Sequence, residues 1–109
     1  MTDVVLAFNE AINAADLARL EALMTDDHRF VDPAGAEVHG RAACLEAWEG
    51  FFAGFPDYRN VFDDVRELAP GEVVAVGRSE CSDPRLAGPA RWTATVAGRR
   101  LRRWQVEDA

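Results

Sequence analysis

Midway along the chain, the spacing of apolar residues changes from a helical period to an alternating one. Apolar side chains recur at helical intervals over residues 3–15, which predicts an amphipathic helix. Asp16 is suited to cap a second, short helix that runs to Met24. A third helix is expected over about 41–54, where a Pro-Asp pair soon follows and stops it. The first half of the chain is therefore predicted to be mainly helical.

A short hairpin separates the second and third predicted helices. His28 to Asp32 has the pattern of a strand, residues 33–36 carry the Pro and Gly of a turn, and 37–39 form a brief return strand. If Phe30 faces the interior, the period of two puts Asp32 on the same face. The pattern therefore predicts a partly desolvated carboxylate at the wall of an apolar interior.

The second half of the chain alternates between apolar and polar positions. Strands are expected near residues 58–68, 72–82, 90–96 and 99–107. Helices followed by a meander of strands predict an α+β fold, in which the helices cover one face of a strongly curved antiparallel sheet. A sheet of this shape tends to enclose a pocket, and ligand pockets are mostly apolar with few polar groups.

Composition and charge narrow the class of function. The chain has 109 residues, 49% of them hydrophobic, which suits one domain over residues 1–109 with a single core. Its net charge of −7 argues against a general nucleic-acid binder, because neutralising phosphates needs a surplus of cations. All 12 cations are arginines, so Schiff-base chemistry and a lysine-bound pyridoxal cofactor are excluded. We expect a protein without a cofactor.

Targeting signals and metal ligands are not recognisable. The amino terminus lacks the cationic start of a signal peptide, and no apolar run approaches the length of a membrane span, so we expect a soluble cytoplasmic protein that does not bind membranes. Cys44 and Cys81 are expected to be reduced thiols. His28 and His39 have no third ligand at a typical spacing, so no metal site is predicted.

Four segments carry a family resemblance: "VDPAG" with "HGR" around the hairpin, "FFAGFPDY" after the third helix, and the closing "GRRLRRWQVED". In this order of elements the chain resembles the nuclear transport factor two-like superfamily, and within it the SnoaL-like polyketide cyclases and the ketosteroid isomerases. The resemblance implies a cone-shaped α+β barrel around a ligand pocket, and a homodimer formed through the outer face of the sheet.

The resemblance also implies roles for single residues. Asp32 occupies the position of the general base in ketosteroid isomerases, in the Asp-Pro-x-Gly turn. Phe8 stands where those enzymes have an oxyanion-binding tyrosine, and their late aspartate falls near Ala90 or Arg91 here. An arginine could still stabilise an oxyanion by its charge. The chain is therefore not expected to be an efficient steroid isomerase.

Several candidate site residues have two interpretations. Asp32 is either a base or ligand-orienting group, or an aspartate whose side chain bonds to the backbone amides of its own turn. Tyr58, the only phenol, is either a hydrogen-bond donor or a packing residue at the pocket rim. Arg78 and Arg91 are either outward-facing cations or inward partners for an oxyanion. The pocket is expected to be lined by apolar rings from separate elements: Phe8, Phe30, Trp48, Phe52 and Phe55.

These residues favour a SnoaL-like enzyme that needs no cofactor and acts on an apolar, carbonyl-bearing ring or polyketide-like molecule. Asp32 would remove a proton next to the carbonyl, while Tyr58 or an inward arginine would share the oxyanion charge. The alternatives are a domain that binds an apolar ligand without catalysis, a dimeric assembly domain, and an epoxide hydrolase. The last would need an Asp-Arg-Asp set, for which Asp32, either Arg78 or Arg91, and Asp108 are available.

Overall fold

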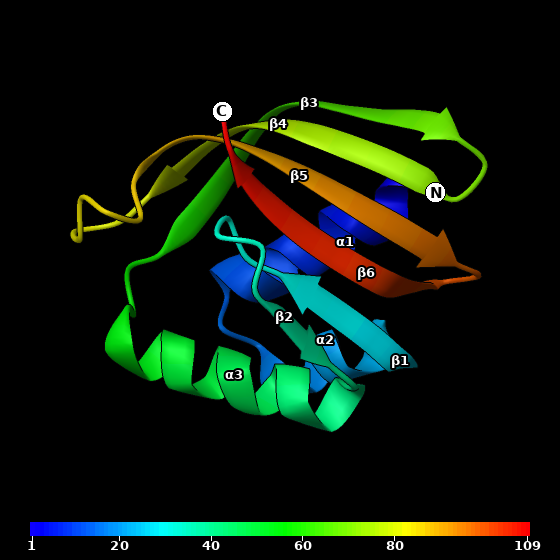
Figure 1. Ribbon diagram of the computed structural model, residues 1–109, viewed down its shortest axis with the longest axis horizontal. Helices are drawn as coiled ribbons and strands as arrows, with labels where there is room; N and C mark the ends of the chain where they lie inside the picture. The colour runs from blue at the N-terminus through cyan, green and yellow to red at the C-terminus, as the bar shows by residue number, and fades with distance from the viewer.

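Three helices and six strands make up the computed structural model, which describes residues 1–109 (Figure 1). The helices are α1 (Thr2–Asn13), α2 (Leu17–Ala22) and α3 (Arg41–Gly54). The strands are β1 (Met24–Val31), β2 (Glu37–His39), β3 (Arg59–Ala69), β4 (Glu72–Glu80), β5 (Gly88–Ala97) and β6 (Arg100–Asp108). The curved sheet lies over α1 and α3, so the helices cover one of its faces, and the predicted α+β fold is confirmed (Figure 1).

The strand order corrects one part of the prediction. The sheet is β2-β1-β6-β5-β4-β3, and β1 pairs with β6 in parallel, whereas every other pair is antiparallel. Parallel pairing needs a long connection between the two strands, and here the whole of β2 to β5 supplies it. The sheet is also open, with β2 and β3 as its edges, so it forms a curved half-cone and not a closed barrel.

β1 begins earlier than predicted. The pattern predicts a second helix that runs to Met24, but β1 already begins at Met24. The polar run Thr25-Asp26-Asp27 therefore lies in β1, where the register with β6 shifts between Met24 and Arg29. The irregular pairing lets polar residues occupy a strand without entering the core. α2 is correspondingly short, and Asp16 caps it as predicted by accepting a hydrogen bond from the Arg19 amide at 3.0 Å.

The core lies between the helices and the concave face of the sheet. Phe8 of α1 is fully buried against Trp104 of β6, with ring centroids 4.8 Å apart. Phe62 of β3 packs on Trp92 at the same centroid distance of 4.8 Å. Apolar residues of α1 therefore join the strands of the meander into one core.

His28 is fully buried in this core. Its Nδ1 lies 2.6 Å from the carbonyl oxygen of Leu101 and donates to it, which leaves Nε2 without a hydrogen-bond partner. Burial lowers the pKa of His28, although the Leu101 carbonyl and the charge of Asp27 oppose the shift. The imidazole is therefore a neutral structural group that links β1 to β6.

Close backbone approach explains one glycine of the sheet. A Cβ atom on Gly77 of β4 would lie 2.0 Å from the carbonyl oxygen of Val61 in β3. Only a residue without a side chain fits there.

No helix of the molecule has the length and apolar character needed to cross a membrane.

Candidate functional site

A cavity of about 390 Å³ opens between α3, the ends of β1 and β6, and the loop that joins β4 to β5. Its lining is mostly hydrophobic, with 12 of 19 residues of that kind. The aromatic members are Phe30, Trp48, Phe51, Tyr58 and Trp104. The polar and charged members, apart from Tyr58 and the thiol of Cys44, are Asp32, Ser79, Arg85 and Asp108.

The aromatic wall is a continuous set of contacts that starts on β1 and crosses α3. Phe30 meets Trp48 edge-on with ring centroids 5.6 Å apart, and Trp48 meets Phe51 edge-on at 5.7 Å. Phe51 in turn contacts Tyr58 edge-on at 4.8 Å. Edge-to-face pairs of this kind fix the rings and add to the stability gained by burying them. The wall therefore presents a rigid apolar surface to a ligand.

Asp32 lies at the edge of this wall, directly after β1. Its Oδ1 accepts hydrogen bonds from the backbone amides of Ala34 and Ala36, both at 2.9 Å, so the carboxylate does form the side-chain turn. The residue also lines the cavity together with Phe30, two positions before it. Oδ2 makes no hydrogen bond within the protein. The turn and cavity interpretations of Asp32 are therefore compatible.

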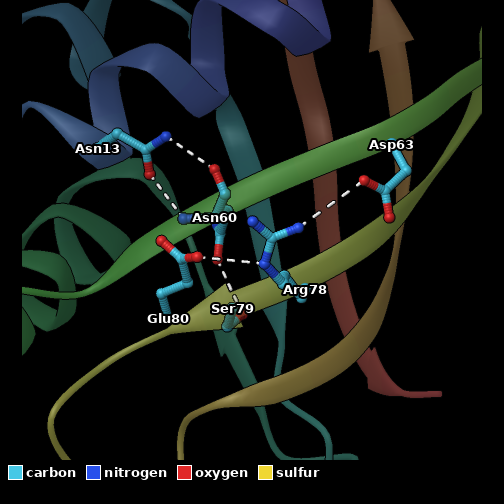
Figure 2. A network of polar contacts seen from close by, with 6 residues as sticks. All are labelled: Asn13, Asn60, Asp63, Arg78, Ser79 and Glu80. Carbon is cyan, nitrogen blue, oxygen red and sulfur yellow. Dashed lines mark hydrogen bonds and ion pairs between the residues drawn. The ribbon is translucent and has the colours of Figure 1, made fainter.

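Tyr58 lines the cavity and is held by a polar network. Its hydroxyl lies 3.1 Å from Ser79 Oγ, and Ser79 donates to Asn60 Oδ1 at 2.9 Å. Figure 2 shows the next links, in which Asn13 of α1 binds both the backbone amide and the carbonyl of Asn60, at 2.8 and 2.9 Å. The network thus fixes the start of β3 and the end of β4 to α1.

Burial raises the pKa of the Tyr58 hydroxyl, and the hydrogen bonds to Ser79 and Asn60 oppose the shift. A phenol with a raised pKa stays protonated at neutral pH. Tyr58 is therefore a hydrogen-bond donor beside the cavity.

Both candidate arginines lie on the outer face of the sheet. Arg78 pairs with Glu80 at 3.1 Å and Asp63 at 3.9 Å, away from Ser79 (Figure 2). Arg91 pairs with Glu107 at 3.1 Å. Because the neighbours Ser79, Ala90 and Trp92 are buried on the inner face, the period of two turns both arginines outward. Neither arginine lines the cavity.

The predicted aromatic lining is only partly brought together. Phe30 and Trp48 line the cavity, whereas Phe8, Phe52 and Phe55 do not. Phe8 is buried beneath Trp104 as a core residue. Phe52 stacks on Trp48, with ring centroids 5.4 Å apart. Apolar residues at helical spacing predict which side chains of a helix point inward. The spacing does not show which of these side chains are buried in the core and which line the cavity.

The sequence interpretation missed Arg85, Phe51 and Trp104 as parts of this site. Arg85 reaches the cavity mouth from the β4–β5 loop, and its side chain is 83% exposed. It donates to both carboxylate oxygens of Asp83, at 3.1 and 2.7 Å, and this pairing lowers the pKa of Asp83 to about 2. Trp104 was identifiable from its alternation with Val106 and Asp108, which also line the cavity.

Metal or thiol chemistry finds no support in the side-chain arrangement. No group of three or more His, Cys, Asp or Glu residues is placed to hold a metal ion. Cys44 lines the cavity, but burial raises its pKa and its Sγ lies 3.4 Å from the carbonyl oxygen of Val38. The thiol is therefore in the unreactive protonated form at neutral pH.

Solved structures with the same fold carry names from several activities. A protein assigned as a polyketide cyclase from Sinorhizobium meliloti is 17% identical, with a TM-score of 0.86 over 96% of this chain and 94% of that one. A cystatin-fold protein from Novosphingobium aromaticivorans is 19% identical, with a TM-score of 0.81 over 95% and 94% of the two chains. A protein from Catenulispora acidiphila with a ketosteroid isomerase-like fold, solved in complex with trimethylamine, is 18% identical, with a TM-score of 0.79 over 97% and 85%.

At these identities the structures show a shared fold and no shared activity. No curated protein matches the chain by sequence. The sequence does match the SnoaL-like domain over residues 5–108, which is nearly its whole length. The chain therefore belongs to the SnoaL-like family.

Proposed function

We propose that this protein is a cofactor-independent cyclase or isomerase, which removes a proton next to the carbonyl group of an apolar ring or polyketide-like substrate. One observation carries the proposal: a carboxylate and a phenol, Asp32 and Tyr58, line the same aromatic cavity. Proton abstraction next to a carbonyl needs this pair of functions, since a base takes the proton and a donor holds the developing oxyanion.

Asp32 acts as the base through Oδ2, because Oδ1 is engaged by the amides of Ala34 and Ala36. The C–H electrons move into the enolate, and Asp32 holds the proton until it is returned to another carbon. Tyr58 donates to the enolate oxygen. Since Ser79 donates its own proton to Asn60, the Tyr58 hydroxyl donates to Ser79, and a substrate oxygen competes for that proton.

The walls support the same chemistry. A cavity of about 390 Å³ is at the small end of the roughly 300–1,000 Å³ of ordinary ligand pockets, which suits a ligand of two or three rings. The aromatic lining makes the surroundings of the reacting carbon less polar than water, and a less polar medium strengthens the interaction of Tyr58 with a developing charge.

The test is proton exchange at carbon, which needs no knowledge of the natural substrate. The apolar bicyclic ketone 2-tetralone is incubated with the protein in D₂O, and loss of its α-proton NMR signal gives the exchange rate. Removing a general base costs roughly 10²–10⁴ in rate, so Asp32→Asn should return exchange to near the buffer rate. Tyr58→Phe should slow exchange by roughly 10²-fold or more if it holds the oxyanion.

Asp63→Asn is the matched control, because Asp63 is an exposed carboxylate on the outer face, paired with Arg78. It should exchange 2-tetralone at the wild-type rate. Exchange by Asp32→Asn at the wild-type rate would show that Asp32 is only a turn residue. Tight binding of 2-tetralone without exchange in the wild type would support the non-catalytic ligand-binding alternative.

An epoxide hydrolase is the second candidate, because the cavity lining brings together Asp32, Arg85 and Asp108. The arginine at the cavity is Arg85, and not Arg78 or Arg91 as the sequence suggested. One carboxylate would take a proton from water as the water oxygen bonds to an epoxide carbon, and a protonated carboxyl would give its proton to the epoxide oxygen as the C–O bond breaks. Hydrolysis of 1-methylcyclohexene oxide, lost in Arg85→Gln and retained in Arg78→Gln, would favour this candidate over the isomerase.

A further inference from the structure

Two carboxylates interrupt the inner face of neighbouring strands at the same end of the sheet. β1 and β6 run parallel, with Phe30 beside Trp104. Asp32 is the second residue after Phe30, and Asp108 is in phase with Trp104 and Val106. Both carboxylates line the cavity. An inner face that should be apolar throughout therefore ends in two acidic groups at the cavity mouth.

Neither carboxylate is neutralised by the protein. No arginine or histidine forms an ion pair with Asp32 or Asp108. The only cation of the cavity lining is Arg85, whose guanidinium is held by both oxygens of Asp83. The Asp83–Arg85 pair is neutral as a unit, so the mouth of the cavity carries the uncompensated charge of Asp32 and Asp108.

The cavity beside these carboxylates is lined by five aromatic rings. Phe30, Trp48, Phe51, Tyr58 and Trp104 all contribute to the lining. Aromatic faces attract cations because the ring quadrupole is negative above the ring, and ligands that carry a quaternary ammonium group are recognised in this way. They repel anions for the same reason. Negative carboxylates and aromatic rings in one cavity therefore favour positively charged ligands.

From this arrangement we infer that the ligand of the cavity is a cationic amine, with its apolar rings between the aromatic walls and its ammonium group at the mouth beside Asp108. The inference rests on the proposed function in that it takes the cavity as the small-molecule site. It narrows the substrate to an apolar carbonyl compound that also carries an amine, and it excludes carboxylates and phosphate esters.

The two carboxylates have different parts in this arrangement. Two backbone amides fix the Asp32 carboxylate in one orientation, as a base aimed at a carbon atom requires. Asp108 is exposed, and its side chain makes no hydrogen bond, so its carboxylate is free to follow a partly hydrated ammonium group. Asp108 is thus the anchoring residue, and Asp32 remains the base.

A pair of probes that differ only in charge tests the inference. Benzyltrimethylammonium and neopentylbenzene have the same shape. The first has a positively charged quaternary nitrogen where the second has a neutral quaternary carbon, and its charge is permanent because the nitrogen carries no proton. Their binding is measured by NMR titration of the indole N–H signals of the three tryptophans. The wild-type protein should bind the cation about tenfold or more tightly than the neutral probe, and added salt should narrow the difference.

Asp108→Asn should bring the affinity for the cation close to that for the neutral probe, with little change in the affinity for the neutral probe. Glu107→Gln is the matched control, since Glu107 is the adjacent carboxylate and pairs with Arg91 on the outer face. It should keep the wild-type preference. Equal affinities in the wild type, or an unchanged preference in Asp108→Asn, would overturn the inference.

The 2-tetralone experiment separates this inference from the proposed function. A preference for the cation without proton exchange in 2-tetralone would leave the amine inference standing and reject the catalytic proposal. Proton exchange without a preference for the cation would leave the catalytic proposal standing and reject the amine inference. If neither probe binds, the cavity is not a site for molecules of this class, and the inference is overturned.

Discussion

Asp32 shows how one side chain serves the fold and the cavity at once. One carboxylate oxygen accepts two amide hydrogen bonds and closes the turn between β1 and β2. The other makes no hydrogen bond within the protein, and the residue lines the cavity. An asparagine keeps an oxygen acceptor for the same amides, but it has no basic oxygen. An alanine has neither. The two substitutions therefore separate the structural role of Asp32 from its chemical role.

Asp32→Ala should lower the free energy of unfolding by about 1–3 kcal/mol, because the amides of Ala34 and Ala36 lose their charged acceptor. Asp32→Asn should lose clearly less, since a neutral acceptor replaces the charged one. Urea denaturation followed by circular dichroism measures both values. Equal losses for the two variants would show that the asparagine oxygen does not replace the carboxylate as the acceptor of the turn.

His28 predicts a pH dependence of stability. Its folded-state pKa is lowered from 6.5 by burial, so between that lowered value and 6.5 the unfolded chain binds more protons than the folded one. The contribution of His28 to the free energy of unfolding is then fully present above pH 6.5. It decreases as the pH falls below 6.5 toward the lowered pKa of the folded state, with a limiting slope of about 1.4 kcal/mol per pH unit. Urea denaturation at pH 7.5 and 5.5 should show the loss.

His28→Leu should remove the dependence of stability on pH in this range. Its stability should be lower at every pH, because the Leu101 carbonyl loses its hydrogen bond from His28 and keeps only the longer one from Thr25, at 3.4 Å. His39→Gln is the control, since His39 is exposed beside Glu37. The control should keep the dependence. A slope that survives in His28→Leu would assign the titration to another group.

At the scale of elements, the spacing of apolar residues along the chain was enough to predict most helices and strands. The helix over Arg41–Gly54 and the strand over Glu37–His39 have the bounds that the pattern indicates, because turn residues stand at both ends. Alternation also determines the orientation of Arg91: Ala90 and Trp92 are buried, so the residue between them faces outward. The sequence left this orientation open, since either face of an isolated strand can be the inner one.

Loop conformation was beyond the sequence pattern. Arg85 reaches the cavity mouth because the Asp83 side chain accepts from both its backbone amide and its guanidinium. This local arrangement has no periodicity to reveal it. Phe8 and Phe51 were likewise indistinguishable as inward aromatic residues. Only the packing of Phe8 beneath Trp104 makes one a core residue and leaves the other at the cavity.

Gly77 provides a prediction for the sheet. Gly77→Ala forces β3 and β4 apart, because its Cβ would meet backbone atoms of Val61, which cannot rotate away. The expected loss of stability is about 1–3 kcal/mol, as for other overpacked sites. Gly50→Ala in α3 is the control, since nothing lies within 4 Å of the new Cβ. It should be neutral or stabilising by about 0.5–1 kcal/mol. Thermal unfolding of both variants compares them directly.

For the whole molecule, the outer face of the sheet is the surface left uncovered by the helices (Figure 1). It carries ion pairs such as Arg78–Glu80 and Arg91–Glu107, around an exposed apolar residue, Val76. Val76 is 41% exposed on this face. Ion pairs next to an exposed apolar side chain are compatible with an interface, in which apolar contacts are surrounded by polar groups.

We predict that this face forms a homodimer, with Val76 at its centre. Sedimentation at micromolar concentration should give twice the chain mass of 12.0 kDa. Val76→Asp should shift the protein to the monomer, since two carboxylates would face one another across the symmetry axis. Leu6→Asp is the control, because Leu6 is 43% exposed on α1, away from this face. A wild-type monomer would contradict the prediction.

The parallel contact between β1 and β6 has a consequence for the order of folding. β3 to β6 can form hairpin by hairpin, but His28 and Leu101 are 73 residues apart when their strands meet. Closing so long a loop costs entropy, so this pairing belongs to a late step. During synthesis the pairing must wait until β6 has been made. Because Phe30 and Trp104 come together only when β6 joins β1, the cavity does not exist before that step.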